Sequence, residues 1–266
     1  YLRGGPRWRF ANKDFVYFFL NSDSTKKLSF TLGYIKRKTE ENINNLSKYV
    51  IRMNYQPFDA FSMSLNTELQ ETVDKTQYIT TTGFNDEKRY ILGQINNQNW
   101  STTLRLNYSL NPNFSVQFYG QPFISRGIYS DFNFVNNPTA SSFSERVILY
   151  DENQISYTNN PIAIDLNNDG NLEYDFPDGG YLVDDNMNGN LDYAFKKPDF
   201  SFVQFQTNLV VRWEYIPGSE LFFVWSRGSA GSQNFNDSLT DSVRNQVFDT
   251  PASDTFLIKA TYRFVR

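Results

Sequence analysis

The chain has 266 residues, and its 25 Lys plus Arg against 29 Asp plus Glu give a net charge of −4, with neither His nor Cys. These absences exclude a Ser-His-Asp triad, a thiolate nucleophile, a Cys/His zinc site and a disulfide. The mildly acidic balance gives no electrostatic footprint for nucleic acid. Aromatic residues make up 17% of the chain although its mean hydropathy is −0.54, a combination that favours strands with apolar faces and polar loops over an enzyme.

The sequence predicts neither a signal peptide nor a membrane-spanning helix. Residues 1–6 lack an apolar signal core, so we expect a processed form or a piece of a longer chain. The longest apolar run, Phe15–Leu20, is far shorter than the roughly 18–20 residues that a spanning helix needs. A transmembrane β-barrel is still allowed, because its strands need only about 9–11 residues of alternating character.

Alternation of apolar and polar residues predicts β-strands along most of the chain. Near the N-terminus, for example, Leu28, Phe30 and Leu32 share one face, and Ser29 and Thr31 share the other. The first and eighth predicted strands are weaker, because both of their faces are apolar. In chain order the predicted strands are 10–20, 27–34, 48–56, 61–68, 103–110, 114–119, 203–215, 221–227 and 256–264.

The lengths of the connections between these strands alternate. Short turns are expected at 21–25, 56–59, 111–113 and 216–219, and each contains Pro, Gly, Asn or Asp. Long connections are expected at 36–47, 69–99, 125–200 and 228–255. This alternation is typical of an up-and-down antiparallel transmembrane β-barrel, with short periplasmic turns and long external loops. The fold predicted is therefore all-β, with residues 126–200 as a long external loop within the barrel domain.

Strand parity extends this prediction. If the turn at 216–219 is periplasmic, residues 228–255 lie outside and the last strand returns to the periplasm. About nine strands are predicted, whereas single-chain bacterial barrels have even strand numbers. We therefore expect residues 1–266 to be the C-terminal segment of a larger barrel that closes with upstream strands or with another chain. A soluble β-sandwich is the alternative, but the long strands, each polar on one face and tipped with aromatic residues, favour the barrel.

Two similar motifs stand in the long loop, at residues 165–176 and 184–195, and both read D-x-N-x-[DN]-G-N-L-[ED]-Y-x-F. Oxygen-bearing side chains at positions 1, 3 and 5 and Gly at position 6 match the first half of a calcium loop. Position 12 is Phe instead of the usual Glu, so closure needs Glu173, Asp175, Asp178 or Asp192, or ligands exchanged between the copies. The predicted Ca²⁺ ligands are Asp165, Asn167, Asp169, Asn171, Glu173, Asp175, Asp184, Asn186, Asn188, Asn190 and Asp192.

Each of these candidates has a simpler interpretation. The two motifs could be turn-rich loops held by side-chain-to-backbone hydrogen bonds. The pair Asp184 and Asp185 could suggest glycosidase chemistry, but calcium ligation or solvated charge explains it better. Loop tyrosines could stack on sugars or simply pack the loop: Tyr150, Tyr157, Tyr181 and Tyr193. Charged strand residues could line a polar lumen, although cross-strand pairing is favoured: Arg52, Arg105, Arg212, Glu214, Lys259 and Arg263.

Several segments resemble the C-terminal end of a large uncharacterised family of Bacteroidota-type outer-membrane proteins. The most specific are 208–219, with its WEY-PGS run, and 221–226, with its VWS run; 254–259, 113–123 and 28–30 fit as well. The resemblance implies a barrel of unknown function in the outer membrane of a Gram-negative bacterium. Such barrels often follow a family-nine-type carbohydrate-binding module, which this sequence does not include. No catalytic residue carries over.

Three functions are compatible with these observations. The first is a non-enzymatic outer-membrane barrel whose calcium-braced external loops bind or admit a ligand such as a glycan. The second is a barrel anchor subunit of a larger envelope complex. The third is a surface glycan hydrolase whose catalytic part lies outside this chain. The expected partners are the lipid bilayer of the outer membrane and either a glycan or other envelope proteins, with no nucleic acid.

Overall fold

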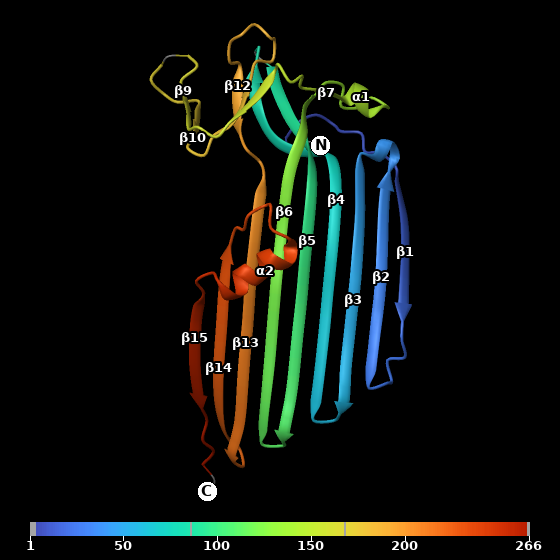
Figure 1. Ribbon diagram of the computed structural model, residues 1–266, viewed down its shortest axis with the longest axis vertical. Coiled ribbons are helices and arrows are strands. Elements are labelled where there is room, and N and C mark those ends of the chain that lie inside the picture. The colour runs from blue at the N-terminus through green and yellow to red at the C-terminus, as the bar shows by residue number, and fades with distance from the viewer. Residues whose placement is uncertain (1–3, 86, 168, 265–266) are drawn as a thin grey trace.

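A computed structural model describes residues 4–85, 87–167 and 169–264. The fold is all-β, with 64% of residues in strands and 7% in helices, and its strand pairs are antiparallel. Nine long strands follow one another in one sheet, in the order β1-β2-β3-β4-β5-β6-β13-β14-β15, with the short β7 beside β6 (Figure 1). Within the described residues, no helix has the length and apolar character needed to cross a bilayer.

The long strands form a meander of hairpins. They are β1 (Lys13–Asn21), β2 (Leu28–Thr39), β3 (Asn44–Phe58), β4 (Phe61–Phe84), β5 (Glu87–Asn111), β6 (Phe114–Val135), β13 (Phe200–Ile216), β14 (Ser219–Gly231) and β15 (Ser253–Ala260). The four short turns predicted from the sequence all lie at one end of the sheet (Figure 1). The turn between β13 and β14 bends at Gly218, whose φ of +78° suits glycine.

At the other end of the sheet the strands are longer than the sequence pattern predicted. The expected loop 69–99 is wrong, because β4 and β5 continue through it as one long hairpin that ends near Asn85. Likewise β6 runs on to Val135, so the long connection occupies residues 136–199 and begins later than expected. Backbone pairing continues here although the side chains no longer alternate in polarity, so the pattern used to recognise strands is absent.

Two adjacent rows of residues show how the two faces of the sheet differ in polarity from β2 to β15. Directly opposed residues of antiparallel strands share a face, and neighbours along a strand lie on opposite faces. One row, here called the apolar row, crosses eight strands and contains only apolar or aromatic residues: Leu28, Tyr55, Met63, Leu106, Phe118, Leu209, Trp225 and Phe256. The adjacent polar row on the other face is Ser29, Asn54, Ser64, Arg105, Tyr119, Asn208, Ser226 and Thr255.

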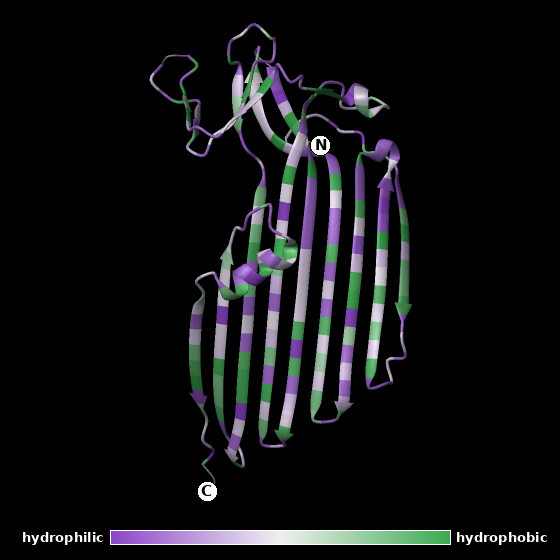
Figure 2. Ribbon diagram, in the orientation of Figure 1, coloured by the Kyte–Doolittle hydropathy of each residue, from purple (hydrophilic) through white to green (hydrophobic). Residues whose placement is uncertain are grey.

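The apolar face is exposed, and green segments recur along the lower strands in Figure 2. No member of the apolar row is buried, and Leu28, Tyr55, Tyr108, Trp213 and Phe256 are each more than one third exposed. The sheet is also open: among the described residues no pairing joins β1 to β15, and all side chains of these two edge strands are exposed. The expected closed barrel is therefore not formed by these nine strands alone.

Residues 136–199 fold into a compact unit above the sheet, here called the cap. It contains α1 (Phe143–Arg146), β7 (Val147–Leu149), β8 (Ile155–Thr158), β9 (Ile162–Ile164), β10 (Tyr174–Phe176), β11 (Gly180–Val183) and β12 (Tyr193–Lys196). Strands β8, β11 and β12 form one small sheet and β9 pairs with β10. Unlike the apolar face, the cap has a buried core, to which Tyr150, Val183, Tyr193 and Phe195 contribute.

The other long connection, between β14 and β15, carries helix α2 (Leu239–Phe248), which begins with a Ser238 cap that accepts from Asp241 N. Its Val243 packs with Ile124 and Val203 on the apolar face of β6 and β13. Figure 1 shows α2 lying across β13, between β14 and β6, partway up the sheet. These contacts bury Ile124 and Val203, so α2 covers the apolar face at its upper margin.

Candidate functional site

The two predicted calcium loops occupy equivalent places in the cap. Residues 165–173 join β9 to β10, and residues 184–192 join β11 to β12, so each motif is the tip of a β-hairpin. In each hairpin the residue before position 1 is paired with the residue after position 9: Ile164 with Tyr174, and Val183 with Tyr193. Gly170 and Gly189 at position 6 have φ values of +88° and +86°. Both bends therefore require glycine.

Position 1 makes the same hydrogen bonds in both loops. Asp165 accepts from Asp169 N at 3.2 Å and from Gly170 N at 2.8 Å. Asp184 accepts from the equivalent Asn188 N at 3.0 Å and Gly189 N at 2.7 Å. The position-3 side chains also make equivalent bonds, because Asn167 and Asn186 accept from the same position-5 amides at 2.9 and 3.0 Å. The repeat in the sequence is thus a repeat in conformation.

The closing carboxylate comes from position 9 in both loops. Glu173 Oε2 accepts from Leu166 N at 2.7 Å, and Asp192 Oδ2 accepts from Asp185 N at 2.7 Å. Of the four candidates for closure, the structure thus brings Glu173 and Asp192 onto their own loops. Asp175 instead lies within β10, opposite Ala163.

The first loop has the spacing that a hard cation requires. One carboxylate oxygen from each of Asp165, Asp169 and Glu173 lies within 4.8 Å of the others. Calcium binds oxygens at about 2.3–2.6 Å, so ligands on opposite sides of the ion lie up to about 5 Å apart. A backbone bond from Asn171 N lowers the pKa of Asp169 and favours the ionised form that a metal binds.

The second loop has one carboxylate fewer at the ligand positions of the motif, because its position 5 is Asn188 instead of an aspartate. Of its three carboxylates, those of Asp184 and Asp192 stand at positions 1 and 9, whereas Asp185 stands at position 2. Asn186 donates to Asp192 at 3.4 Å. Position 7 donates to position 5 in both loops. In the first loop the side-chain Nδ2 of Asn171 donates to Asp169. In the second loop the backbone N of Asn190 donates to Asn188 Oδ1 at 2.8 Å. Fewer ionised ligands lower calcium affinity. The first loop is therefore the stronger candidate. Asn168 of that loop lies outside the described residues.

A buried polar cluster anchors the second loop to the sheet. The guanidinium of Arg89 on β5 donates twice to the Asp185 carboxylate, at 2.8 and 2.9 Å. Tyr193 also donates to Asp185, and the hydroxyls of Tyr193 and Tyr150 lie 2.9 Å apart. The Arg89 guanidinium lies over the Phe134 ring, 4.0 Å from its centroid. This set of Arg89, Asp185, Tyr193 and Tyr150 is here called the anchor cluster.

Burial sets the protonation of the anchor cluster. Desolvation raises the pKa of the Tyr150 and Tyr193 phenols well above their ordinary value, so both remain neutral donors. Desolvation alone would lower the pKa of Arg89, but its hydrogen bonds to Asp185 raise it overall. The pairing is charge-assisted and bidentate, the strongest form of side-chain hydrogen bonding.

Sequence reasoning missed the anchor cluster. Asp185 stands at a variable position of the motif, and its partner Arg89 is 96 residues away. Asp184 and Asp185 make separate contacts, the first with its own loop and the second with Arg89. The loop tyrosines mainly pack the cap onto itself: Tyr181 stacks on Phe195 with ring centroids 5.2 Å apart, and Tyr157 lies beside Tyr181.

Four of the six charged residues contact a neighbouring strand, as their simpler interpretation predicted, whereas Glu214 contacts Arg212 on its own strand and Arg263 lies beyond the end of β15. Arg52 lies 3.8 Å from Glu68, and Arg212 binds both Glu214 and Glu220. Arg105 lies over the ring of Tyr119 on the next strand, and Lys259 over that of Phe222. These residues therefore brace the polar face of the sheet.

Comparison with known proteins gives one match. A family model described as a domain of unknown function (DUF5916) matches residues 4–265. Neither the curated proteins nor the solved structures include a match to this chain.

Proposed function

This chain belongs to the DUF5916 family, and we propose that it forms part of the wall of an up-and-down β-barrel in the outer membrane of a Gram-negative bacterium. Its apolar face contacts lipid, its polar face lines the interior, and its cap projects outward with calcium-braced hairpin tips that serve ligand binding or uptake. We assign no catalytic residue.

The contrast between the apolar row and the polar row is the observation that carries this proposal. Eight consecutive strands each place an apolar or aromatic residue in one row. In the next row seven of them place a polar residue that is not aromatic, and β6 places Tyr119. Lipid-facing and interior-facing residues alternate in this way in transmembrane barrels. In water, an apolar face of this extent would be a site of association.

The height of the apolar face supports the same proposal. On β5 it extends from Tyr108 near the short turn to Trp100 near α2. These nine residues span about 26 Å along the strand at roughly 3.3 Å per residue, or about 20 Å of height at the tilt of about 40° usual in outer-membrane barrels, whose apolar band is about 25 Å tall. Aromatic residues at both ends correspond to the aromatic girdles of such barrels. Helix α2 would then lie at the outer membrane–water interface.

The open edges add a requirement to the proposal. Unpaired backbone groups cost several kcal/mol each in hydrocarbon, so spanning sheets are closed. The outer edges of β1 and β15 must therefore pair with further strands in the membrane.

The test uses the absence of native cysteine, which makes any introduced cysteine unique. Spin labels at Leu209→Cys and Val211→Cys report on the apolar face, and labels at Gln206→Cys and Asn208→Cys are matched controls on the polar face of β13. The full chain in lipid bilayers should give labels at 209 and 211 that collide mainly with oxygen, which concentrates in hydrocarbon. Labels at 206 and 208 should collide mainly with a water-soluble nickel chelate.

A different pattern of label accessibility would contradict the proposal. If labels at 209 and 211 are shielded from both reagents, and the chain is a monomer without detergent, the apolar face packs against protein and the barrel assignment fails.

A further inference from the structure

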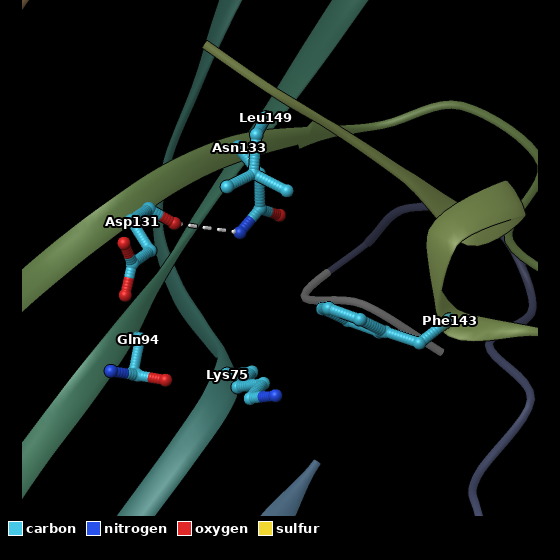
Figure 3. A pocket seen from close by; sticks show the side chains of 6 residues that line it. All are labelled: Lys75, Gln94, Asp131, Asn133, Phe143 and Leu149. Atoms are coloured by element: carbon cyan, nitrogen blue, oxygen red, sulfur yellow. Dashed lines mark hydrogen bonds between the residues drawn. The ribbon is translucent and has the colours of Figure 1, made fainter. Parts of the chain in front are cut away.

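A small cavity lies between the sheet and the first part of the cap, and no residue of the two calcium loops lines it (Figure 3). It is lined by Lys75 on β4, Gln94 on β5, Asp131 and Asn133 on β6, Phe143 on α1 and Leu149 on β7. Its volume is about 190 Å³. Pockets for drug-sized molecules are about 300–1,000 Å³, so this one suits a single small ring.

A β-bulge shapes the cavity. On β6, Ser130 pairs with Gln94 and Asn133 pairs with Leu92, which leaves one extra residue on β6. Asp131 within this bulge has a φ of +48°. Such a conformation is uncommon outside glycine and is tolerated by aspartate. Bulges re-aim side chains and are frequent beside binding sites.

The bulge leaves a buried acceptor without a donor. Asn133 is 2% exposed, and its Nδ2 donates to Asp131 O at 3.0 Å, the bond drawn in Figure 3. Its Oδ1 is buried and has no partner among the described residues. A buried oxygen without a hydrogen bond destabilises the folded chain, so a donor from a bound molecule would remove that penalty.

The remaining groups define the chemistry of that molecule. The Lys75 ammonium has no acceptor among the described residues, and Figure 3 shows it across the cavity from Asn133. The positive charge of Lys75 and the negative charge of Asp131 cancel, so the lining favours neither an anion nor a cation. The buried polar atom is a neutral amide oxygen, and burying a hydroxyl there costs far less than burying an ammonium group.

We propose that this cavity binds one neutral sugar ring, as a free monosaccharide or as the end of a glycan. Each hydroxyl both donates and accepts, so neighbouring hydroxyls can donate to Asn133 Oδ1 and Asp131 while accepting from Lys75. The C–H face of the ring packs on Phe143. The inference deepens the ligand binding proposed above and rests on that part of the proposal, but it does not depend on insertion of the sheet into a membrane.

The experiment is calorimetric titration of the folded full chain with glucose, galactose and N-acetylglucosamine. Glucuronate and leucine serve as anionic and zwitterionic comparators. At least one neutral sugar should bind saturably and more tightly than either comparator. Lys75→Met should weaken that binding about tenfold, because it removes a hydrogen bond to a charged group. Lys38→Met, which changes an exposed lysine on β2 outside this cavity, is the matched control and should leave it unchanged.

Phe143→Leu provides a second variant, which should also weaken binding while leaving the circular dichroism of the strands intact. The inference fails if no neutral sugar binds the folded chain, if leucine or glucuronate binds better, or if binding is the same in both variants. None of these outcomes changes the spin-label pattern expected for β13, so failure of the cavity assignment is distinguishable from failure of the membrane assignment.

Discussion

The nine-strand sheet and the cap treat their apolar residues in opposite ways. In the apolar row of the sheet no side chain is buried, and Phe256 is 65% exposed. In the cap, Val183 and Tyr193 are completely buried and Phe195 is 2% exposed. Both regions have strands with aromatic residues, so composition alone does not distinguish them.

The two regions are therefore suited to different surroundings. The cap gains stability by removing apolar surface from water, at about 25 cal/mol per Å², and does so within its own residues and the strand ends beneath it. The sheet gains little in this way, because its apolar face has no protein partner in the described chain apart from α2. Under our proposal, lipid takes the place of that partner.

The largest effect that separates the regions is expected from Arg89→Ala. This change leaves the Asp185 carboxylate, 6% exposed, without its counterion. Removing one partner of a buried ion pair typically costs about 3–5 kcal/mol. Hydrogen exchange should show the free energy of opening falling by that amount for cap amides such as those of Leu182 and Ala194, with little change at β3.

Arg52→Ala is the matched control. Its ion pair with Glu68 spans 3.8 Å and the arginine side chain is 53% exposed. Exposed pairs contribute at most about 1 kcal/mol, so the cap should be unaffected. Equal loss of protection in the cap and at β3 after Arg89→Ala would show that the two regions unfold together and would contradict the comparison.

The sheet was predictable from sequence where one face is apolar and the other polar. The alternation in 203–215 and the Pro-Gly turn after it predicted the β13–β14 hairpin that the structure contains. The same reasoning failed for 69–99, where Asn96, Asn97 and Asn99 still pair with β4 or β6. Backbone pairing does not require apolar and polar residues to alternate. Strand ends with polar residues on both faces are therefore predicted, wrongly, as loops.

The candidate site was predictable only in part, for a similar reason. The calcium motifs are local, so position and spacing identified Asp165 and Asp184 and left the closing residue open. The Arg89–Asp185 pair and the Asn133 cavity depend on residues brought together by the fold. The extra residue in β6 that creates the cavity appears only when the register against β5 is known.

The second expected effect is stabilisation of the cap by calcium. Under our proposal only the folded loops bind Ca²⁺, so free Ca²⁺ at about a hundred times its dissociation constant should stabilise the cap by about 2.7 kcal/mol. The double change Asp165→Asn with Asp169→Asn should remove most of this gain, and hydrogen exchange of cap amides with and without Ca²⁺ measures it.

Glu152→Gln alters an exposed cap carboxylate outside both loops and is the control for charge. It should leave the response to calcium intact. If calorimetry detects no calcium binding to the full chain, the metal assignment is wrong and the loops are held by their own hydrogen bonds alone.

The smallest effect is a difference in the response to high pH. The pKa values of Tyr150 and Tyr193 are raised by burial, so between the ordinary tyrosine value of about 10 and the raised values the folded cap keeps protons that the unfolded cap releases. Their contribution to the stability of the cap is fully present below about pH 10 and is lost as the pH rises further. The reason is that raising the pH lowers the free energy of unfolding wherever the folded state binds more protons than the unfolded state. Cap amides should therefore lose protection above about pH 10 before those of β3 do. Tyr150→Phe removes one of the two phenols and should reduce this alkaline loss. If the loss in the variant is as steep as in the unchanged chain, the buried phenols do not control it.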